Sequence, residues 1–428
     1  MKRLLLLIAV FTSCSVLVKA QTSGTATRPE KCGTMSHLDA MKLQNPGLEQ
    51  QMASDEARLQ NIMDQQAASR TSSPSVVYTI PVVVHVVYRT TGQNISNAQI
   101  QSQIDVLNED YAKLNADTVN IGSGFQALAS STQFQFCLAN TDPNGNLTTG
   151  IERVQTTTTA FTQNDNVKHT STGGLDAWDV NNYFNIWVCN MSGGILGYAE
   201  FPAATHTNTY GVVIQYNSFG RVGTVSAPYN LGRTAAHEIG HCFRLYHIWG
   251  DDGGSCSGTD YVADTPNQAD MTYGCLNYPA NDACNSTASG IMFNNYMDYS
   301  DDDCLNMFTV NQAARMYTAV NTMYNTLLHS TRCESPNGVN EVNNLAFSVY
   351  PNPTDGIVNI DMFTLQQKFP KLNLRVTDVV GRVVSETSVE NPSGRVEQLD
   401  LSNEANGIYF VTLYNNEVSK TVKFTIAR

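Results

Sequence analysis

The sequence has 428 residues, of which 42% are hydrophobic and 15% are charged, so it can form two or three domains with real hydrophobic cores and is not a disordered chain. Its formal net charge is −13. An acidic balance argues against a nucleic acid or an anionic membrane as a partner, because both carry negative charge.

The first twenty residues predict a signal peptide. Lys2 and Arg3 precede an apolar run over residues 4–18, and Ala20 is a small residue after which we expect cleavage. No other run approaches the ~20 apolar residues that a transmembrane helix needs. We therefore expect an exported protein without a transmembrane segment.

Residues 21–75 are polar and rich in Gln, Ser and Thr, with a helical piece over residues 36–68. Little in this segment can form a core, so we predict a removable pro-segment that ends in a Ser/Pro linker. It contains the short sequence Lys31-Cys32-Gly33-Thr34.

The main domain is expected over residues 76–335. Residues 76–88 are β-branched and predict its first strand, and later strands are predicted over residues 134–138, 183–189 and 211–216. The nearly all-apolar run at 183–189 indicates a central strand. A helix begins near Ser96 or Asn97, with a buried stripe formed by Ile100, Ile104, Leu107, Tyr111 and Leu114, and a second helix over residues 310–328 closes the domain.

The sequence HEIGHCFRLYH begins at His237. His237 and His241 share one face of a helix, so both imidazoles can bind one Zn²⁺ at ~2.0–2.1 Å. Glu238 lies beside that face, where its carboxylate can hold a water molecule and take its proton. His247 reaches the same ion only if the helix ends near Arg244 and the chain turns back. Three protein ligands and one open position are typical of a catalytic zinc.

This run resembles the metzincin consensus HExxHxxGxxH, and Leu245-Tyr246-His247 is similar to the pappalysin family of metalloproteases. The resemblance implies an α+β catalytic domain with a mixed twisted sheet and a zinc helix. It also implies a secreted zinc endopeptidase, in which Glu238 activates water for hydrolysis of peptide bonds. Arg244 departs from the family, which has Gly there. A left-handed residue with a Cβ costs about 1–2 kcal/mol, so a catalytically weak or inactive protease-like binding protein is the alternative.

The same resemblance extends to Cys32. Cys32-Gly-Thr is similar to the start of bacterial pappalysin pro-segments, and a thiolate is a good fourth zinc ligand that would keep water out. We expect Cys32 to confer latency; the alternative is an incidental free thiol.

Three residues near Asn295-Tyr-Met-Asp-Tyr-Ser300 gain roles from the family. The resemblance implies a Met-turn in which Met297 packs beneath the zinc histidines, and Tyr299 can hydrogen-bond the oxyanion formed during attack. It places Asp302 at the floor of the pocket for the residue after the cleaved bond. A carboxylate there favours Arg, then Lys.

An enzyme that cuts before Arg can release its own pro-segment, so we expect processing between Ser69 and Arg70. Thr331-Arg332 offers a second site at the end of the catalytic domain.

The loop after the zinc helix resembles bacterial relatives in two further ways. Asp260, Val262 and Thr265 offer oxygen ligands that suit Ca²⁺. Four cysteines in this loop are expected to form disulfides, as is usual in exported proteins. The resemblance pairs Cys256 with Cys284 and Cys275 with Cys304, while Cys137, Cys189, Cys242 and Cys333 are left unassigned.

Beyond a linker at residues 336–344, residues 345–428 alternate in a β pattern with Gly, Asn and Pro turns, which predicts an all-β sandwich. Its Tyr350-Pro-Asn-Pro sequence, the run Gly407-Ile-Tyr and the last nine residues resemble the sorting domain of the type 9 secretion system. The implied partners are that secretion machinery and protein or peptide substrates, and the implied route runs through the periplasm and across the outer membrane to the surface or the medium.

Overall fold

The structure is a computed structural model that describes residues 30–69, 76–203, 206–334, 347–362, 369–392, 394–415 and 419–428. The expected signal peptide (1–20), Arg70 of the expected processing site and the expected linker (336–344) lie outside the described residues. Within the described ranges, no helix is both long enough and apolar enough to cross a membrane.

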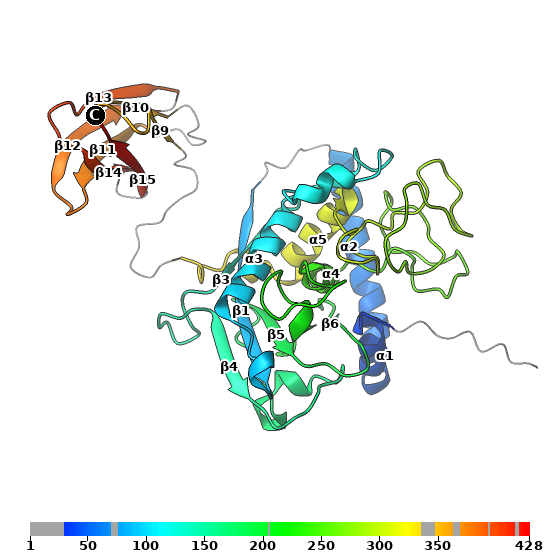
Figure 1. Cartoon of the computed structure of the whole chain (residues 1–428). Helices are drawn as coiled ribbons and strands as arrows, with labels where there is room; N and C mark the ends of the chain where they lie inside the picture. The colour runs from blue at the N-terminus through cyan, green and yellow to red at the C-terminus, as the bar shows by residue number, and fades with distance from the viewer. Residues whose placement is uncertain are drawn as a thin grey trace, which may run out of the picture.

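The N-terminal segment forms two helices, α1 (Thr34–Gln44) and α2 (Leu48–Ser69), so the prediction of one continuous helical piece was wrong. The break follows Asn45, because Pro46 has no N–H and disfavours helical backbone at the residue before it. Asn45 accordingly has φ −128° and ψ 90°. Helix α2 packs against α5 (Val310–Met323) of the main domain (Figure 1).

A mixed sheet forms the centre of the main domain, with strand order β3-β1-β5-β7-β6 and β4 as a further partner of β1. All neighbouring strands are parallel except the edge strand β6, which is antiparallel to β7. Strand β5 is central, as its apolar sequence predicted. The bounds are β1 (Tyr78–Tyr88), β3 (Phe134–Leu138), β4 (Ile151–Gln155), β5 (Phe184–Cys189), β6 (Gly197–Ala199) and β7 (Gly211–Gln215).

Two helices, α3 (Asn97–Tyr111) and α4 (Arg233–Cys242), contact each other and the sheet (Figure 1). The Ser96 side chain caps α3 by accepting a hydrogen bond from the Gln99 amide. The predicted stripe is buried except for Leu114, which is 75% exposed, so that part of the prediction was wrong. The helix ends at Tyr111, and Lys113 adopts φ 56°, which takes the chain off the helical path before Leu114.

The predicted closing helix is α5 followed by a single turn, α6 (Asn325–Leu328). A capping box of Thr309 and Gln312 starts α5. The remaining short elements are η1 (Thr91–Gln93), η2 (Ala116–Asn120), η3 (Asn166–Lys168), η4 (Thr170–Thr172), η5 (Tyr216–Ser218), β2 (Ala129–Ser130) and β8 (Phe308–Thr309).

The loop between α4 and β8 contains little regular structure and is cross-linked. Its disulfides join Cys256 to Cys284 and Cys275 to Cys304, the pairs that the family resemblance implies. A third disulfide joins Cys137 in β3 to Cys333, near the end of the main domain. Sequence reasoning left this pair unassigned because 196 residues separate its members.

The C-terminal region has its own hydrophobic core and two antiparallel sheets, as the strand pattern predicted. Strands β13, β10 and β9 form one sheet, and β12, β11, β14 and β15 form the other. Their bounds are β9 (Ser348–Tyr350), β10 (Ile357–Asp361), β11 (Lys371–Asp378), β12 (Val383–Glu390), β13 (Val396–Asp400), β14 (Gly407–Tyr414) and β15 (Ser419–Ile426).

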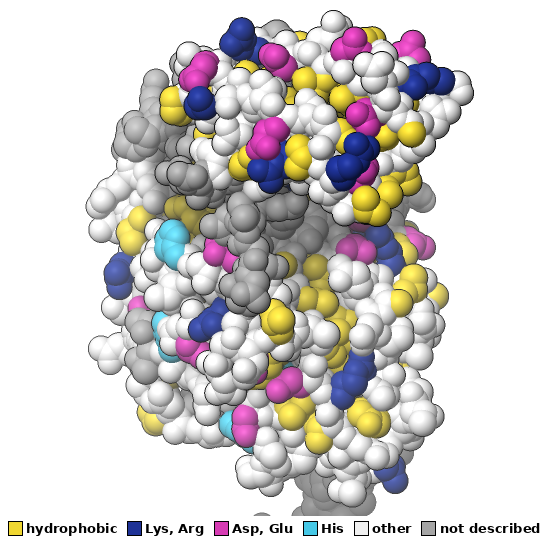
Figure 2. All heavy atoms as spheres, turned by 90° about the vertical axis from the view of Figure 1, so that its left-hand side faces the viewer, with side chains coloured by type: hydrophobic (Ala, Val, Ile, Leu, Met, Phe, Trp, Pro, Cys, Tyr) yellow, Lys and Arg dark blue, Asp and Glu magenta, His cyan; other side chains and the backbone are white. Residues whose placement is uncertain are grey.

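On the face seen in Figure 2, acidic and basic side chains of the described residues alternate, with hydrophobic side chains between them. No broad basic patch marks this face among those residues, which agrees with the net charge of −13.

Candidate metal centre

Helix α4 carries His237 and His241 and is buried along its whole length. It begins after Gly232, whose φ of 82° lies in the left-handed region that glycine adopts without strain. A buried ion pair of Arg233 with Asp110 and a partly buried one with Asp117 fix its first turn. His237 and His241 project from one face, four residues apart.

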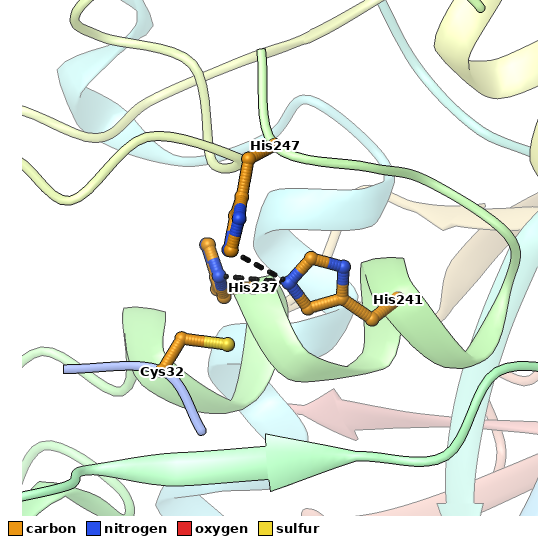
Figure 3. Close-up of side chains that lie close together, drawn as sticks. All are labelled: Cys32, His237, His241 and His247. Carbon is orange, nitrogen blue, oxygen red and sulfur yellow. Dashed lines mark hydrogen bonds between the residues drawn. The ribbon is translucent and has the colours of Figure 1, made fainter. Parts of the chain in front are cut away.

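The chain turns back directly after α4, as the position of His247 required. Arg244 adopts φ 73°, and the Leu245 amide donates a 2.9 Å hydrogen bond to the Gly240 carbonyl. The Nε2 atom of His241 then lies 3.1 Å from Nε2 of His237 and 3.1 Å from Nε2 of His247. The three rings converge on one point (Figure 3).

Each imidazole is oriented through its outer nitrogen. Nδ1 of His237 lies 2.7 Å from the Tyr296 carbonyl, and Nδ1 of His241 lies 2.8 Å from the Leu245 carbonyl. Nδ1 of His247 lies 2.8 Å from the carboxylate of Asp251. Such acceptors keep the proton on Nδ1, so each Nε2 presents a lone pair to the common point.

The protonation states of His237 and His241 suit the binding of a cation. Burial lowers the pKa of His237 to about 3 and that of His241 well below 6.5, so both rings are neutral at neutral pH. Neutral lone pairs this close repel one another, and a cation between them removes the repulsion. The donor set of three imidazole nitrogens suits Zn²⁺.

Glu238 lies beside the histidines and is 1% exposed. Its Oε2 accepts a 2.8 Å hydrogen bond from the Thr34 hydroxyl and lies 3.4 Å from the Sγ of Cys32. Burial raises the pKa of Glu238 to about 7, against the opposing effect of these hydrogen bonds. A carboxyl with a pKa near neutrality can accept a proton and return it.

Cys32 of the N-terminal segment completes the cluster. Its sulfur and one ring nitrogen from each of the three histidines all lie within 4.8 Å of one another, and the four residues are buried (Figure 3). Burial raises the pKa of the thiol well above 9.0. Proximity to a metal ion acts the other way and favours the thiolate.

Cys32 pairs with the edge of the sheet through an isolated β-bridge. Cys32 forms a parallel bridge with Gly197 of β6, through hydrogen bonds from Gly33 N to Gly197 O (2.8 Å) and from Leu196 N to Lys31 O (2.7 Å). The N-terminal segment therefore covers the free edge of β6 in front of the histidines.

The Met-turn residues pack around the same site. Met297 is fully buried, and its Sδ lies so close to Gly240 of α4 that an added Cβ there would meet it at 2.5 Å. The centre of the Tyr299 ring lies 5.7 Å from the ring centre of His237 and 5.1 Å from that of His247. The Tyr299 hydroxyl donates a 3.2 Å hydrogen bond to the Cys32 carbonyl.

Asp302 lines a cavity next to the histidines and is 1% exposed. Its Oδ2 accepts a 2.7 Å hydrogen bond from the Leu231 amide, and burial raises its pKa to about 6. Lys31 also lines this cavity, with its Nζ 3.8 Å from Asp301 and 4.2 Å from the ring centre of Tyr229. The N-terminal segment thus supplies a cation to the cavity.

Arg244 does not point into the cluster of histidines. Its guanidinium is buried and hydrogen-bonds the carbonyls of Pro202 (3.0 Å) and Met52 (2.9 Å). The departure from the family consensus therefore leaves the ring nitrogens free.

The three residues expected to bind calcium lie together. Asp260 accepts hydrogen bonds from the Val262 amide (3.0 Å) and the Thr265 hydroxyl (2.7 Å), and Thr265 also lies 2.9 Å from the Val262 carbonyl. Burial raises the pKa of Asp260 to about 7. Nothing in the relatives described next bears on calcium at this position.

Residues 164–321 match the family described as Pregnancy-associated plasma protein-A. An extracellular metalloprotease of Arthroderma otae is 33% identical over 257 residues, which is 58% of this chain and 80% of that protein. The chain belongs to the pappalysin family of metalloproteases.

Two solved structures show the fold of this family. Mature Tannerella forsythia mirolysin in complex with a cleaved peptide is 51% identical, with a TM-score of 0.60, over 62% of this chain and all of that one. A mutant of promirolysin from the same organism is 46% identical, with a TM-score of 0.66, over 72% of this chain and all of that one. The catalytic region has the metzincin-like fold of these pappalysins, and the chain is a metalloendopeptidase of the zinc-dependent kind.

Residues 348–427 match a second family, the Secretion system C-terminal sorting domain. This confirms the prediction of a type 9 sorting tail. With the extracellular relatives, it makes the protein a secreted or cell-surface pappalysin.

Sequence reasoning missed Lys31 and Thr34 as parts of the site, although both flank Cys32. Their adjacency to a predicted metal-binding thiol was the available signal. It also missed Glu56 and Arg315, whose contacts are described below, and no local pattern points to them.

Proposed function

We propose that this pappalysin is an endopeptidase whose Zn²⁺ is held by His237, His241 and His247, with Glu238 as general base. The observation that supports it most is the convergence of three oriented imidazoles beside a buried carboxylate whose pKa lies near 7. When bound, Zn²⁺ supplies Lewis acidity, which lowers the pKa of water toward ~7 and polarises a carbonyl.

The chain's own groups would perform the proton transfers and hold the substrate. Glu238 takes a proton from the attacking water and passes it to the leaving amine. Tyr299 donates a hydrogen bond to the oxygen that becomes negative, and its bond to the Cys32 carbonyl shows that the hydroxyl reaches a backbone oxygen at this position. Met297 packs against Gly240 of α4 and so helps to hold the helix that carries His237 and His241.

The edge of β6 would bind the substrate backbone. Gly197 and Leu196 already exchange backbone hydrogen bonds with the N-terminal segment. A strand added to a sheet edge binds peptides through main-chain groups, with little regard for sequence.

Selectivity for Arg, then Lys, after the cleaved bond would come from Asp302. Its carboxylate lines the cavity, and the ammonium of Lys31 lies in that cavity against aromatic rings. A cationic side chain of the latent chain thus occupies the space proposed for a cationic substrate side chain.

Cys32 would keep the full-length chain latent. Its sulfur takes the place near the histidines that water needs, and Thr34 holds Glu238. Cleavage between Ser69 and Arg70, near the end of the proposed pro-segment (21–75), would release the residues before the cut and expose both; Ser69 is the last residue of α2. We further propose a catalytic domain at 76–335, a linker at 336–344 and a sorting domain at 345–428, which the two family matches and the two hydrophobic cores support.

A calcium ion at Asp260, Val262 and Thr265 stays a prediction. The hydrogen bonds among these residues gather oxygen ligands around one buried carboxylate.

Digestion of a peptide library by the processed enzyme tests the proposed function. We expect cuts before Arg and Lys that stop when the metal is chelated and resume when zinc is restored. Cuts that persist without metal, or the absence of any cut, would contradict the proposal.

A further inference from the structure

Two buried arginines of the catalytic domain meet one carboxylate of the N-terminal segment. Both guanidiniums of Arg244 and Arg315 are fully buried. Glu56 in α2 forms a two-pronged ion pair with Arg315, in which Oε1 and Oε2 each lie 2.7 Å from a guanidinium nitrogen. The Nε of Arg244 lies 3.4 Å from Oε2 of the same residue.

Contacts within the catalytic domain orient Arg315 to bind an anion. Arg315 is held by a 2.9 Å hydrogen bond from its Nε to the Arg244 carbonyl and lies against the rings of Tyr246 and Tyr261. Its two terminal nitrogens are thereby left for a carboxylate, which a guanidinium fork binds with matched geometry.

Glu56 is the carboxylate that compensates these charges. Among the described residues, no acidic group other than Glu56 lies within 4.0 Å of either guanidinium. A buried cation that loses its partner is strongly unfavourable. The contact therefore ties α2 to the catalytic domain at a place separate from the histidines.

We propose that Arg244 and Arg315 form a carboxylate-binding site on the catalytic domain, which holds the N-terminal segment through Glu56 as a second anchor independent of Cys32. Two anchors on one segment reinforce each other, because release of one leaves the other to hold the segment at high effective concentration. The site also gives the arginine at position 244 a role in the latent chain. The inference rests on the proposed pro-segment at residues 21–75.

The test measures how often the segment opens in the intact full-length chain. A thiol-alkylating reagent is added to unprocessed protein, and mass spectrometry follows labelling of Cys32, which is buried when the segment is closed. The variants are Glu56→Gln, which keeps the shape and removes the charge, and Glu49→Gln, which removes an exposed carboxylate from the same helix.

We expect Glu56→Gln to speed the labelling of Cys32 roughly ten- to hundredfold, the effect of losing a charged hydrogen-bonded pair. Glu49→Gln should leave the rate within about twofold of the unchanged protein, since exposed charges contribute little. Equal rates for the two variants would overturn the proposal. This readout needs no protease activity, so it stands apart from failure of the proposed catalysis.

Two buried thiols report on folding in the same experiment. Cys189 and Cys242 are buried in the catalytic domain and must stay unlabelled if the variant is folded. Should Glu56→Gln expose them, Glu56→Asp, which keeps the charge on a shorter side chain, replaces it. Faster Cys32 labelling than in Glu49→Gln, with both thiols protected, then supports the second anchor, and unchanged labelling contradicts it.

Discussion

The Sγ of Cys32 lies 3.4 Å from Oε2 of Glu238, although 206 residues separate the two in sequence. The thiol therefore faces the group proposed as general base and the three histidines at once. One residue of the N-terminal segment can therefore block both the proposed metal position and the proposed general base, as the proposal of latency through Cys32 requires.

Replacing Cys32 should weaken latency without loss of the fold. We expect unprocessed Cys32→Ala protein to regain part of the activity of the processed enzyme, because the fourth position beside the histidines becomes free for water while the rest of the segment still covers β6. Asp39→Asn, a change at an exposed carboxylate of α1, is the matched control and should remain latent. Activity of unprocessed chains is measured with a second substitution, Arg70→Ala, that blocks the expected cut. Full latency of Cys32→Ala would show that another contact silences the enzyme.

Asp302 should decide selectivity in the processed enzyme. Asp302→Asn removes the charge at the cavity and is expected to lower kcat/KM for a peptide with Arg after the cleaved bond roughly ten- to hundredfold. A peptide with Leu at that position should be little affected. The control is Asp303→Asn, at an exposed neighbour. A uniform loss for both peptides would assign Asp302 a structural role, through its bond to Leu231.

Arg244 should be tolerated by the catalytic site. The side chain points away from the histidines, and the backbone already has the left-handed conformation that a glycine would adopt. We expect Arg244→Gly to change kcat/KM of the processed enzyme by less than about threefold, since only about 1–2 kcal/mol of local strain is relieved. A large gain in rate would instead mean that this arginine weakens the native enzyme.

The pH dependence of stability can test the calcium prediction. Burial raises the pKa of Asp260 to about 7 in the folded chain, from an ordinary value of 3.8. Without calcium, the folded state binds this proton more tightly than the unfolded state, so the free energy of unfolding falls as pH rises between these values. Calcium holds the carboxylate ionised, so added Ca²⁺ should raise Tm more at pH 8 than at pH 5. Asp260→Asn should remove this difference between the two pH values. If Ca²⁺ does not change Tm of the unsubstituted protein, the calcium site is refuted.

Much of the fold could be predicted from the sequence because the signals are local. The apolar run of β5, the Ser96 cap of α3 and the spacing of His237 and His241 each depend on a few neighbouring residues. The spacing of His241 and His247 also required the turn after α4, which the left-handed Arg244 makes. Family resemblance supplied two disulfide pairs, which spacing alone does not determine.

The rest depends on contacts between distant parts of the chain. The ion pair of Glu56 with Arg315 spans 259 residues, and nothing near either residue marks it. The position of Lys31 in the Asp302 cavity likewise follows from how the N-terminal segment lies along β6. Leu114 was misplaced because the helical period was continued past the end of α3.

Cleavage by the Glu238→Ala enzyme tests the central claim most directly. The substitution leaves the three imidazoles in place, so processed protein should still bind one zinc ion, measured by metal analysis. We predict that kcat/KM for an Arg-containing peptide falls about 10²- to 10⁴-fold, the usual contribution of a general base. Unchanged cleavage by zinc-loaded Glu238→Ala enzyme would contradict the account.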